Sequence, residues 1–275
     1  MSATDPVSHI SDAELLSMTR DLDALHHDLT LPALKDSLSE WTEEIRERTA
    51  AGEPEETEQR MFFDRRKFLI GTGGLAGGAL LAACSSSGKP ASSPSSSPSA
   101  MAGGEGQKLS GDLQVVAMAA SLENSGIATY MAGIKAATAG KLGTVPGAVV
   151  TFAETAMSQH QDHVQAWNSV LTSSGKQAVT AVDSVIQPTI NTAFGKVKTV
   201  AELAALALMV ENIAGETYQN GLSVIKSAAG IKTAASIQPV EFQHAAILSF
   251  VLGQYPVPNS FTGVSSARPP SDYHT

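Results

Sequence analysis

Two residues with metal-binding side chains, Glu241 and His244, lie three positions apart within an otherwise apolar stretch, residues 239–252. In an α-helix, residues at this spacing lie on the same face, which here is the apolar face. Burying a carboxylate and an imidazole is costly unless the two groups are paired or bind a metal ion. If Glu241 and His244 bind a metal ion, other parts of the chain must supply further ligands.

An internal repeat supplies two lone glutamates. Glu123 and Glu211 are each followed by Asn, and each is followed by Thr-Tyr six and seven residues further on. The tyrosines, Tyr130 and Tyr218, share the helix face of these glutamates. We expect them to be core tyrosines whose hydroxyl groups find polar partners.

The second part of each repeat carries two potential ligands at the spacing i, i+3. His160 and His163 align with Glu241 and His244. Each half of the repeat therefore offers one lone glutamate and one pair of side chains on a single helix face.

This arrangement resembles the ferritin-like superfamily, and especially the exported bacterial ferritin-like domains. In that family the first and third helices each contribute a Glu, and the second and fourth each contribute a Glu-x-x-His motif. The resemblance covers residues 108–255 and implies an all-α, ferritin-like four-helix bundle that binds iron or manganese. The residues at matching positions are Glu123, His163, Glu211, Glu241 and His244.

His160 departs from the family pattern, because it stands where a second bridging glutamate is expected. Three rather than four carboxylates would then balance the metal charge. One alternative is a di-metal site that accepts His160 as a ligand. The other is a site that holds only one zinc or manganese ion, or none. Asp162 and Glu154 are candidates for compensation, but Asp162 lies a step around the helix and Glu154 does not share the face.

Four predicted helices position these residues. They cover residues 109–139, 147–173, 199–229 and 233–253, with turns at Gly143–Gly147 and at Gly230. Residues 175–198 lack a strong periodic pattern and contain Pro188. Short connections within each pair and one long connection between the pairs are typical of a ferritin-like bundle with one crossover. We expect residues 256–275 to form a polar tail.

Residues 61–83 have the features of an export signal. Arg65 and Arg66 precede an apolar, Gly-rich region of 16 residues, which is shorter than the roughly 20 residues of a membrane-spanning helix. The arginine pair resembles the twin-arginine export motif, and the sequence Leu-Ala-Ala-Cys ending at Cys84 resembles a bacterial lipobox. These resemblances imply the twin-arginine export machinery as a partner and lipidation of Cys84. Residues 84–107, rich in Ser, Pro and Gly, would tether the domain to the outer face of the cytoplasmic membrane.

A predicted leader, residues 1–60, precedes this signal. Periodic apolar residues predict two amphipathic helices in it, residues 11–29 and 32–48. We expect the adjacent His26 and His27 to lie at the surface. There are two explanations. Residues 1–60 form a cytoplasmic segment that is lost on cleavage, or translation begins at Met61 and the sequence is given with a start that lies too far upstream.

The charge distribution argues against nucleic-acid binding. Residues 1–60 carry 15 acidic and five basic residues, whereas residues 84–275 carry 11 and 10, with no basic patch. The single cysteine excludes an intrachain disulfide and a Cys-based zinc site. Three hypotheses follow: a membrane-tethered metal-binding bundle with iron or peroxide chemistry, a metal-free bundle serving as a binding or structural lipoprotein of the envelope, and an adhesion or scaffold protein.

Overall fold

The structure is a computed structural model, which describes residues 10–51, 109–257 and 262–272 of the 275-residue chain. Over these residues the fold is all-α, as predicted, and contains no strand. The helices are α1 (Asp12–Leu25), the π-helical turn η1 (His26–Thr30), α2 (Leu31–Ala50), α3 (Asp112–Thr138), α4 (Gly147–Ser173), α5 (Gln187–Phe194), α6 (Val200–Val224), α7 (Ala228–Val251) and the 3₁₀ turn η2 (Pro270–Asp272).

The predicted export signal with Arg65 and Arg66, the lipidation site Cys84 and the tether lie outside the described residues. Among the helices that the structure does describe, none has both the length and the hydropathy that crossing a bilayer requires. Export and lipidation therefore stay predictions.

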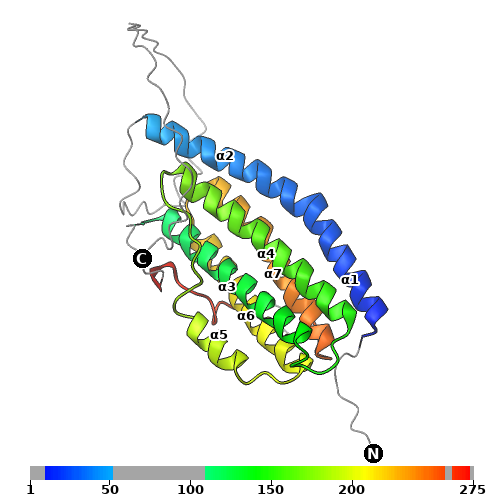
Figure 1. Cartoon of the computed structure of the whole chain (residues 1–275). Coiled ribbons are helices and arrows are strands. Elements are labelled where there is room, and N and C mark those ends of the chain that lie inside the picture. The colour runs from blue at the N-terminus through cyan, green and yellow to red at the C-terminus, as the bar shows by residue number, and fades with distance from the viewer. Residues whose placement is uncertain (1–9, 52–108, 258–261, 273–275) are drawn as a thin grey trace, which may run out of the picture. The chain divides into compact units, whose positions relative to one another are not determined.

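Helices α3, α4, α6 and α7 form the predicted bundle (Figure 1). α3 packs along α4, α6 packs along α7, and α3 also contacts α6. Residues 139–146 join α3 to α4 and residues 225–227 join α6 to α7, whereas residues 174–199 form the long crossover. This connectivity confirms the predicted four-helix bundle with one crossover.

The boundary between α6 and α7 differs from the prediction. α6 ends at Val224, and Gly230 does not close it but lies in the first turn of α7. Ile225 has an extended backbone, and the side chain of Ser227 caps α7 by accepting a hydrogen bond from the Gly230 N–H at 3.1 Å. Gly230 has a packing role, because a Cβ atom there would lie 2.8 Å from the ring of Trp41.

The crossover contains a short helix, α5, that the hydrophobic pattern did not predict. Its eight residues supply too few turns for a clear period. Asp183 organises its start, since its carboxylate accepts hydrogen bonds from the backbone N–H groups of Val185 and Ile186 at 2.9 and 2.8 Å. Ile190 is buried against the bundle, so α5 fixes the crossover to the α3–α6 side.

The two helices predicted in residues 11–48 are one continuous helix, which we call the N-terminal helix (Asp12–Ala50). The backbone stays helical through His26 and Leu31, and only the π-helical turn η1 separates α1 from α2. The break was predicted before Pro32, which has no N–H and whose ring would clash with the carbonyl of Asp28 in a regular helix. The wider turn η1 directly precedes this proline, so the helix continues with a π-turn instead of a loop.

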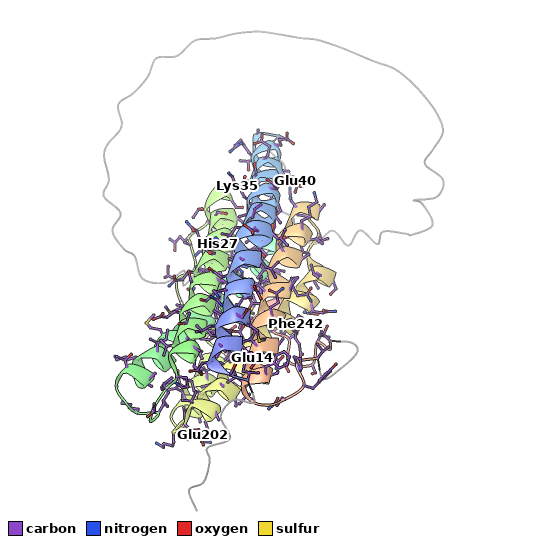
Figure 2. All side chains as sticks on the ribbon, turned by 90° about the vertical axis from the view of Figure 1, so that its right-hand side faces the viewer. Glu14, His27, Lys35, Glu40, Glu202 and Phe242 are labelled. Carbon is purple, nitrogen blue, oxygen red and sulfur yellow. The ribbon has the colours of Figure 1, made fainter. Side chains whose placement is uncertain are left out.

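The N-terminal helix packs against both α4 and α7 (Figures 1 and 2). Its buried residues are Leu15, Thr19, Leu22, His26, Leu34, Ser37 and Trp41. Eight positions separate His26 from Leu34, which in a regular α-helix would turn Leu34 about 80° away from His26. The π-turn holds more residues per turn and reduces this angle, so both parts of the helix face the bundle.

Specific contacts hold the N-terminal helix in place. Thr233 donates to Ser37 at 2.9 Å, and Lys232 forms an ion pair with Glu40 at 2.6 Å. Each of the three buried leucines in this helix contributes about 1.5–3 kcal/mol by burial. The N-terminal helix therefore packs against the bundle through a continuous buried face.

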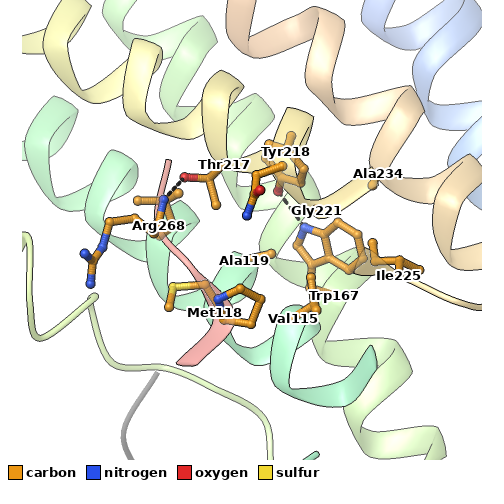
Figure 3. A pocket seen from close by; sticks show the side chains of 13 residues that line it. Val115, Met118, Ala119, Trp167, Thr217, Tyr218, Gly221, Ile225, Ala234 and Arg268 are labelled. Atoms are coloured by element: carbon orange, nitrogen blue, oxygen red, sulfur yellow. Dashed lines mark hydrogen bonds between the residues drawn. The ribbon is translucent and has the colours of Figure 1, made fainter. Parts of the chain in front are cut away.

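Part of the predicted polar tail is packed against α6. The backbone N–H of Arg268 donates to the Thr217 hydroxyl at 2.9 Å, and that of Ser266 donates to the Glu216 carboxylate at 2.6 Å. Figure 3 shows Arg268 beside a small apolar pocket that Trp167 also lines. This segment therefore covers one end of the bundle core.

Candidate metal centre

All six predicted site residues meet in the middle of the bundle, each at most 1% exposed. α3 contributes Glu123, α4 contributes His160 and His163, α6 contributes Glu211, and α7 contributes Glu241 and His244. They form two overlapping groups, in each of which the potential ligand atoms all lie within 4.8 Å of one another. His160 and Glu241 belong to both groups.

His163 and His244, which we call the outer histidines, each turn Nδ1 towards the carboxylates. His163 Nδ1 lies 3.0 Å from an oxygen of Glu241 and 3.5 Å from an oxygen of Glu123. His244 Nδ1 lies 3.4 Å from an oxygen of Glu211. Glu123 and His163 thus form one side of the centre, and Glu211 and His244 form the other.

His160 lies between the two lone glutamates. Its Nδ1 is 2.6 Å from Glu123 and its Nε2 is 3.3 Å from Glu211. Gly126 makes room for this ring, because a Cβ atom there would lie 3.0 Å from it. The aligned residue of the other half is Ala214, so the extra space is present only where the imidazole needs it.

The two repeated tyrosines connect the halves. Tyr130 of α3 donates to Glu211 of α6, and Tyr218 of α6 donates to Glu123 of α3. Trp167 in turn donates to the Tyr218 hydroxyl at 2.6 Å (Figure 3). The expectation of buried tyrosines with polar partners is confirmed, and their partners are the lone glutamates.

The outer nitrogen of His244 has a partner within the bundle. Its Nε2 lies 2.8 Å from the side-chain oxygen of Gln159, which is itself buried. Since an amide oxygen can only accept, Nε2 carries the proton and Nδ1 is left free to face the centre.

The surface prediction is wrong for His26 and fits only His27. His27 has 61% of its side chain exposed, whereas His26 is 1% exposed and its ring centroid lies 5.4 Å from that of His163. His26 Nε2 lies 3.2 Å from a carboxylate oxygen of Asp162. Burial, together with the charge of His163, lowers the pKa of His26 to about 4, so this imidazole is neutral at pH 7.

Neither acidic residue considered as compensation joins the cluster. Asp162 is the partner of His26, and Glu154 is exposed. His26 could have been found in the sequence, because it lies four residues after Leu22 and eleven after Leu15, on the apolar face. For Gln159 and Gly126, no pattern in the sequence signals a role.

Two of the three glutamates are ionised at neutral pH. Burial would raise the pKa of Glu123, but His163 and His160 outweigh it and lower the pKa to about 2. Burial is likewise outweighed at Glu211, whose pKa neighbouring imidazoles hold well below its usual range. At Glu241, burial and the negative charge of Glu123 raise the pKa to about 8, so this carboxyl group holds a proton.

The histidines divide in the same way. Burial would lower the pKa of His163, but Glu123 and Glu241 raise it to about 9. The three glutamates overcome burial at His160 as well and hold its pKa well above the usual range. At His244 burial prevails over the nearby carboxylate and lowers the pKa. Without metal, two imidazolium ions therefore balance two carboxylates.

Several polar atoms in the centre have no hydrogen-bond partner among the described residues. They are both oxygens of Glu241, one oxygen of Glu211, both ring nitrogens of His163 and Nδ1 of His244. Buried polar groups are normally satisfied, and leaving them unpaired costs free energy. Oxygen and imidazole nitrogen atoms are ligands suited to iron, manganese and zinc, so the residues present fit a divalent metal ion.

Comparison with known proteins gives a consistent picture of the fold. A protein-family model described as a ferritin-like domain matches residues 111–254. This segment runs from the start of α3 to just beyond α7 and contains all six residues of the centre. Neither the curated proteins nor the solved structures gave a match.

Proposed function

Because the chain belongs to the ferritin-like domain family, we propose that its bundle binds one or two divalent metal ions, iron or manganese, at this centre. One observation carries the proposal. Glu241 is 0% exposed and belongs to both ligand groups, yet its oxygens have only imidazole nitrogens beside them, at 3.0 and 3.8 Å, and neither oxygen accepts a well-aligned hydrogen bond from the described residues. A cation next to Glu241 would satisfy these oxygens and offset the cost of burying them.

The two overlapping groups assign the ligands. Glu123 and His163 would hold one ion, and Glu211 and His244 would hold the other. Glu241 and His160 belong to both groups and could contribute to holding either ion. A bound iron or manganese ion would supply redox chemistry, such as iron oxidation or the reduction of peroxide.

The protein itself orients the lone carboxylates and excludes bulk water from the centre. Tyr130 and Tyr218 hold the lone carboxylates through hydrogen bonds from the opposite half of the bundle. All six ligands are at most 1% exposed, so bulk water does not compete for the metal. Because Glu241, His160 and His163 hold protons in the metal-free centre, binding must release protons.

A second candidate function is a metal-free bundle that serves as a binding or structural lipoprotein of the cell envelope. The position of His160 favours it, because this imidazolium lies between Glu123 and Glu211 and takes the place of a cation. In that case the buried charges of the centre balance one another without metal.

The location of the protein is part of the proposal. Arg65 and Arg66 support twin-arginine export, and Cys84 supports a lipid anchor on the outer face of the cytoplasmic membrane. The double variant R65K/R66K should accumulate in the cytoplasm, and Cys84→Ser should appear in the soluble exported fraction. Unchanged fractionation of both variants would remove export and anchoring from the proposal.

Elemental analysis of the protein as it is purified from its own host tests metal binding. Two iron or manganese ions per chain support a di-metal centre with His160 as a ligand, and one ion per chain supports a centre with a single metal ion. No metal, and no uptake on titration with iron, manganese or zinc, would overturn the proposal in favour of the metal-free bundle.

A further inference from the structure

The two outer histidines of the centre have different support behind them. Both turn Nδ1 inward, so their outer nitrogens, Nε2, must each carry a proton when Nδ1 binds a metal. Such an outer N–H is commonly held by a second residue, which fixes the ring and its tautomer. For His244, Gln159 fills this role at 2.8 Å.

Behind His163 the bundle provides no such partner. His163 Nε2 has no hydrogen bond within the described part of the chain, although the atom is buried. The neighbouring group is the imidazole of His26, whose ring centroid is 5.4 Å away at an angle of 58°. Nδ1 of His26 is also buried without a hydrogen-bond partner among the described residues.

The other nitrogen of His26 is already assigned. Nε2 lies 3.2 Å from a carboxylate oxygen of Asp162, and since a carboxylate accepts, this hydrogen bond places a proton on Nε2. Nδ1 of His26 is therefore an acceptor. Two neighbouring rings thus hold one unused acceptor, on His26, and one unused donor, on His163.

From these contacts we propose that His26 is a positioning residue for His163. The two nitrogens make no direct hydrogen bond, so Nε2–H of His163 is linked to Nδ1 of His26 through one water, and Nε2–H of His26 donates to Asp162. This chain of hydrogen bonds fixes the tautomer in which Nδ1 of His163 binds metal. The inference rests on the proposed metal binding and assigns the N-terminal helix a part in it.

The fold keeps His26 where this role requires it. His26 opens the π-helical turn η1, and buried leucines lie on either side of it along the N-terminal helix, Leu22 before it and Leu34 after it. The bundle alone therefore supports His244, whereas support for His163 comes from His26, which lies 137 positions earlier in the chain (163 − 26).

The test compares three variants of the full chain, stripped of metal and titrated with Co²⁺ as a spectroscopic probe. His26→Ala should weaken binding of the ion held by His163 by about 10–100-fold and change its visible spectrum. His26→Gln should restore affinity and spectrum, because an amide can accept from His163 and donate to Asp162, as Gln159 accepts from His244. His27→Ala, at the exposed neighbouring position labelled in Figure 2, is the matched control and should behave as the wild type.

The outcomes separate this inference from the proposed function. If the wild type binds no metal, both fall. If the wild type binds metal and His26→Ala binds it with the same affinity and spectrum, the positioning role is overturned and metal binding stands. If His26→Gln remains folded by circular dichroism but is as defective as His26→Ala, His26 merely fills space, which also overturns the positioning role.

Discussion

The first half of the repeat, α3 and α4, contributes one carboxylate and two imidazoles to the centre, whereas α6 and α7 contribute two carboxylates and one imidazole. Both halves place their groups at aligned positions on similar helices, so the difference is one of chemistry and not of backbone. It is accompanied by Gly126, which makes room for His160, where the second half has Ala214. A symmetric scaffold can thus hold an asymmetric site when one position and its packing neighbour differ together.

The largest effect on metal affinity is expected from substitution of Glu241, which both ligand groups share. Glu241→Gln keeps the shape of the side chain but removes the charge shared by both ligand groups. Tight binding of both ions should be weakened by more than about 100-fold, because a ligand shared by both groups matters more than an outer hydrogen bond. Titration calorimetry with Mn²⁺ measures this, and Glu154→Gln on the exposed face of α4 is the control. Retention of both ions would contradict the role of Glu241 as a ligand common to both groups.

Making the halves alike should have the next largest effect. His160→Glu would place a carboxylate beside Glu123 and Glu211 in place of an imidazolium. Without metal, loss of the buried pairing should destabilise the protein by about 3–5 kcal/mol. With metal, four carboxylates would balance two ions, and stability should recover. Urea unfolding with a chelator and then with Mn²⁺ checks both arms, and equal metal-free stability of variant and wild type would contradict the balancing role of His160.

The two outer histidines should respond to pH in opposite directions. The pKa of His163 is raised to about 9, so its stabilising effect is complete below pH 6.5 and is lost as pH rises through 9. The pKa of Glu241, raised to about 8, acts in the same direction: the unfolded carboxyl ionises near pH 4.5, and stability falls from there to pH 8. The pKa of His244 is lowered, so its unfolded form binds a proton first and stability falls below pH 6.5.

Measuring the free energy of unfolding of the metal-free protein across pH 5–10 tests these alkaline and acid losses of stability. His163→Gln should flatten the alkaline loss of stability, and His244→Gln should flatten the acid loss. If both variants keep the wild-type profile, the charge assignment of the two halves is wrong.

The smallest effect concerns the space around His160. Gly126→Ala would bring a Cβ atom to 3.0 Å from the His160 ring, and such overpacking costs about 1–3 kcal/mol before a helix-propensity gain of up to about 1 kcal/mol. Gly221→Ala is the matched control, since its Cβ would meet Val115 at an ordinary 3.8 Å and should leave stability unchanged or higher. Thermal unfolding distinguishes them, and equal melting temperatures for both variants would show that Gly126 is not required.

The sequence predicted the bundle and the clustering of six side chains, because both depend on the helical spacing of apolar and ligand residues and on the internal repeat. Helix spacing places His160 and His163 on one face, and alignment of Glu123 with Glu211 places the lone glutamates at equal heights. The burial of His26 was missed although its spacing from Leu15 and Leu22 places it on the apolar face; its contact with His163 was not predictable, because it depends on how the N-terminal helix packs against α4. The role of Gln159 was not predicted either, because it depends on contact between helices that are far apart in the sequence.

The covalent link through residues 52–110 gives the docking of the N-terminal helix a kinetic meaning. While the link is intact, docking is a first-order equilibrium with an effective concentration up to the order of millimolar, and it does not depend on the amount of protein. Cleavage before Cys84, as the export proposal requires, would turn it into a second-order association that dilution reverses. The uncut chain would then be the form in which both sides of the centre are equally supported, and metal loading would be favoured before processing.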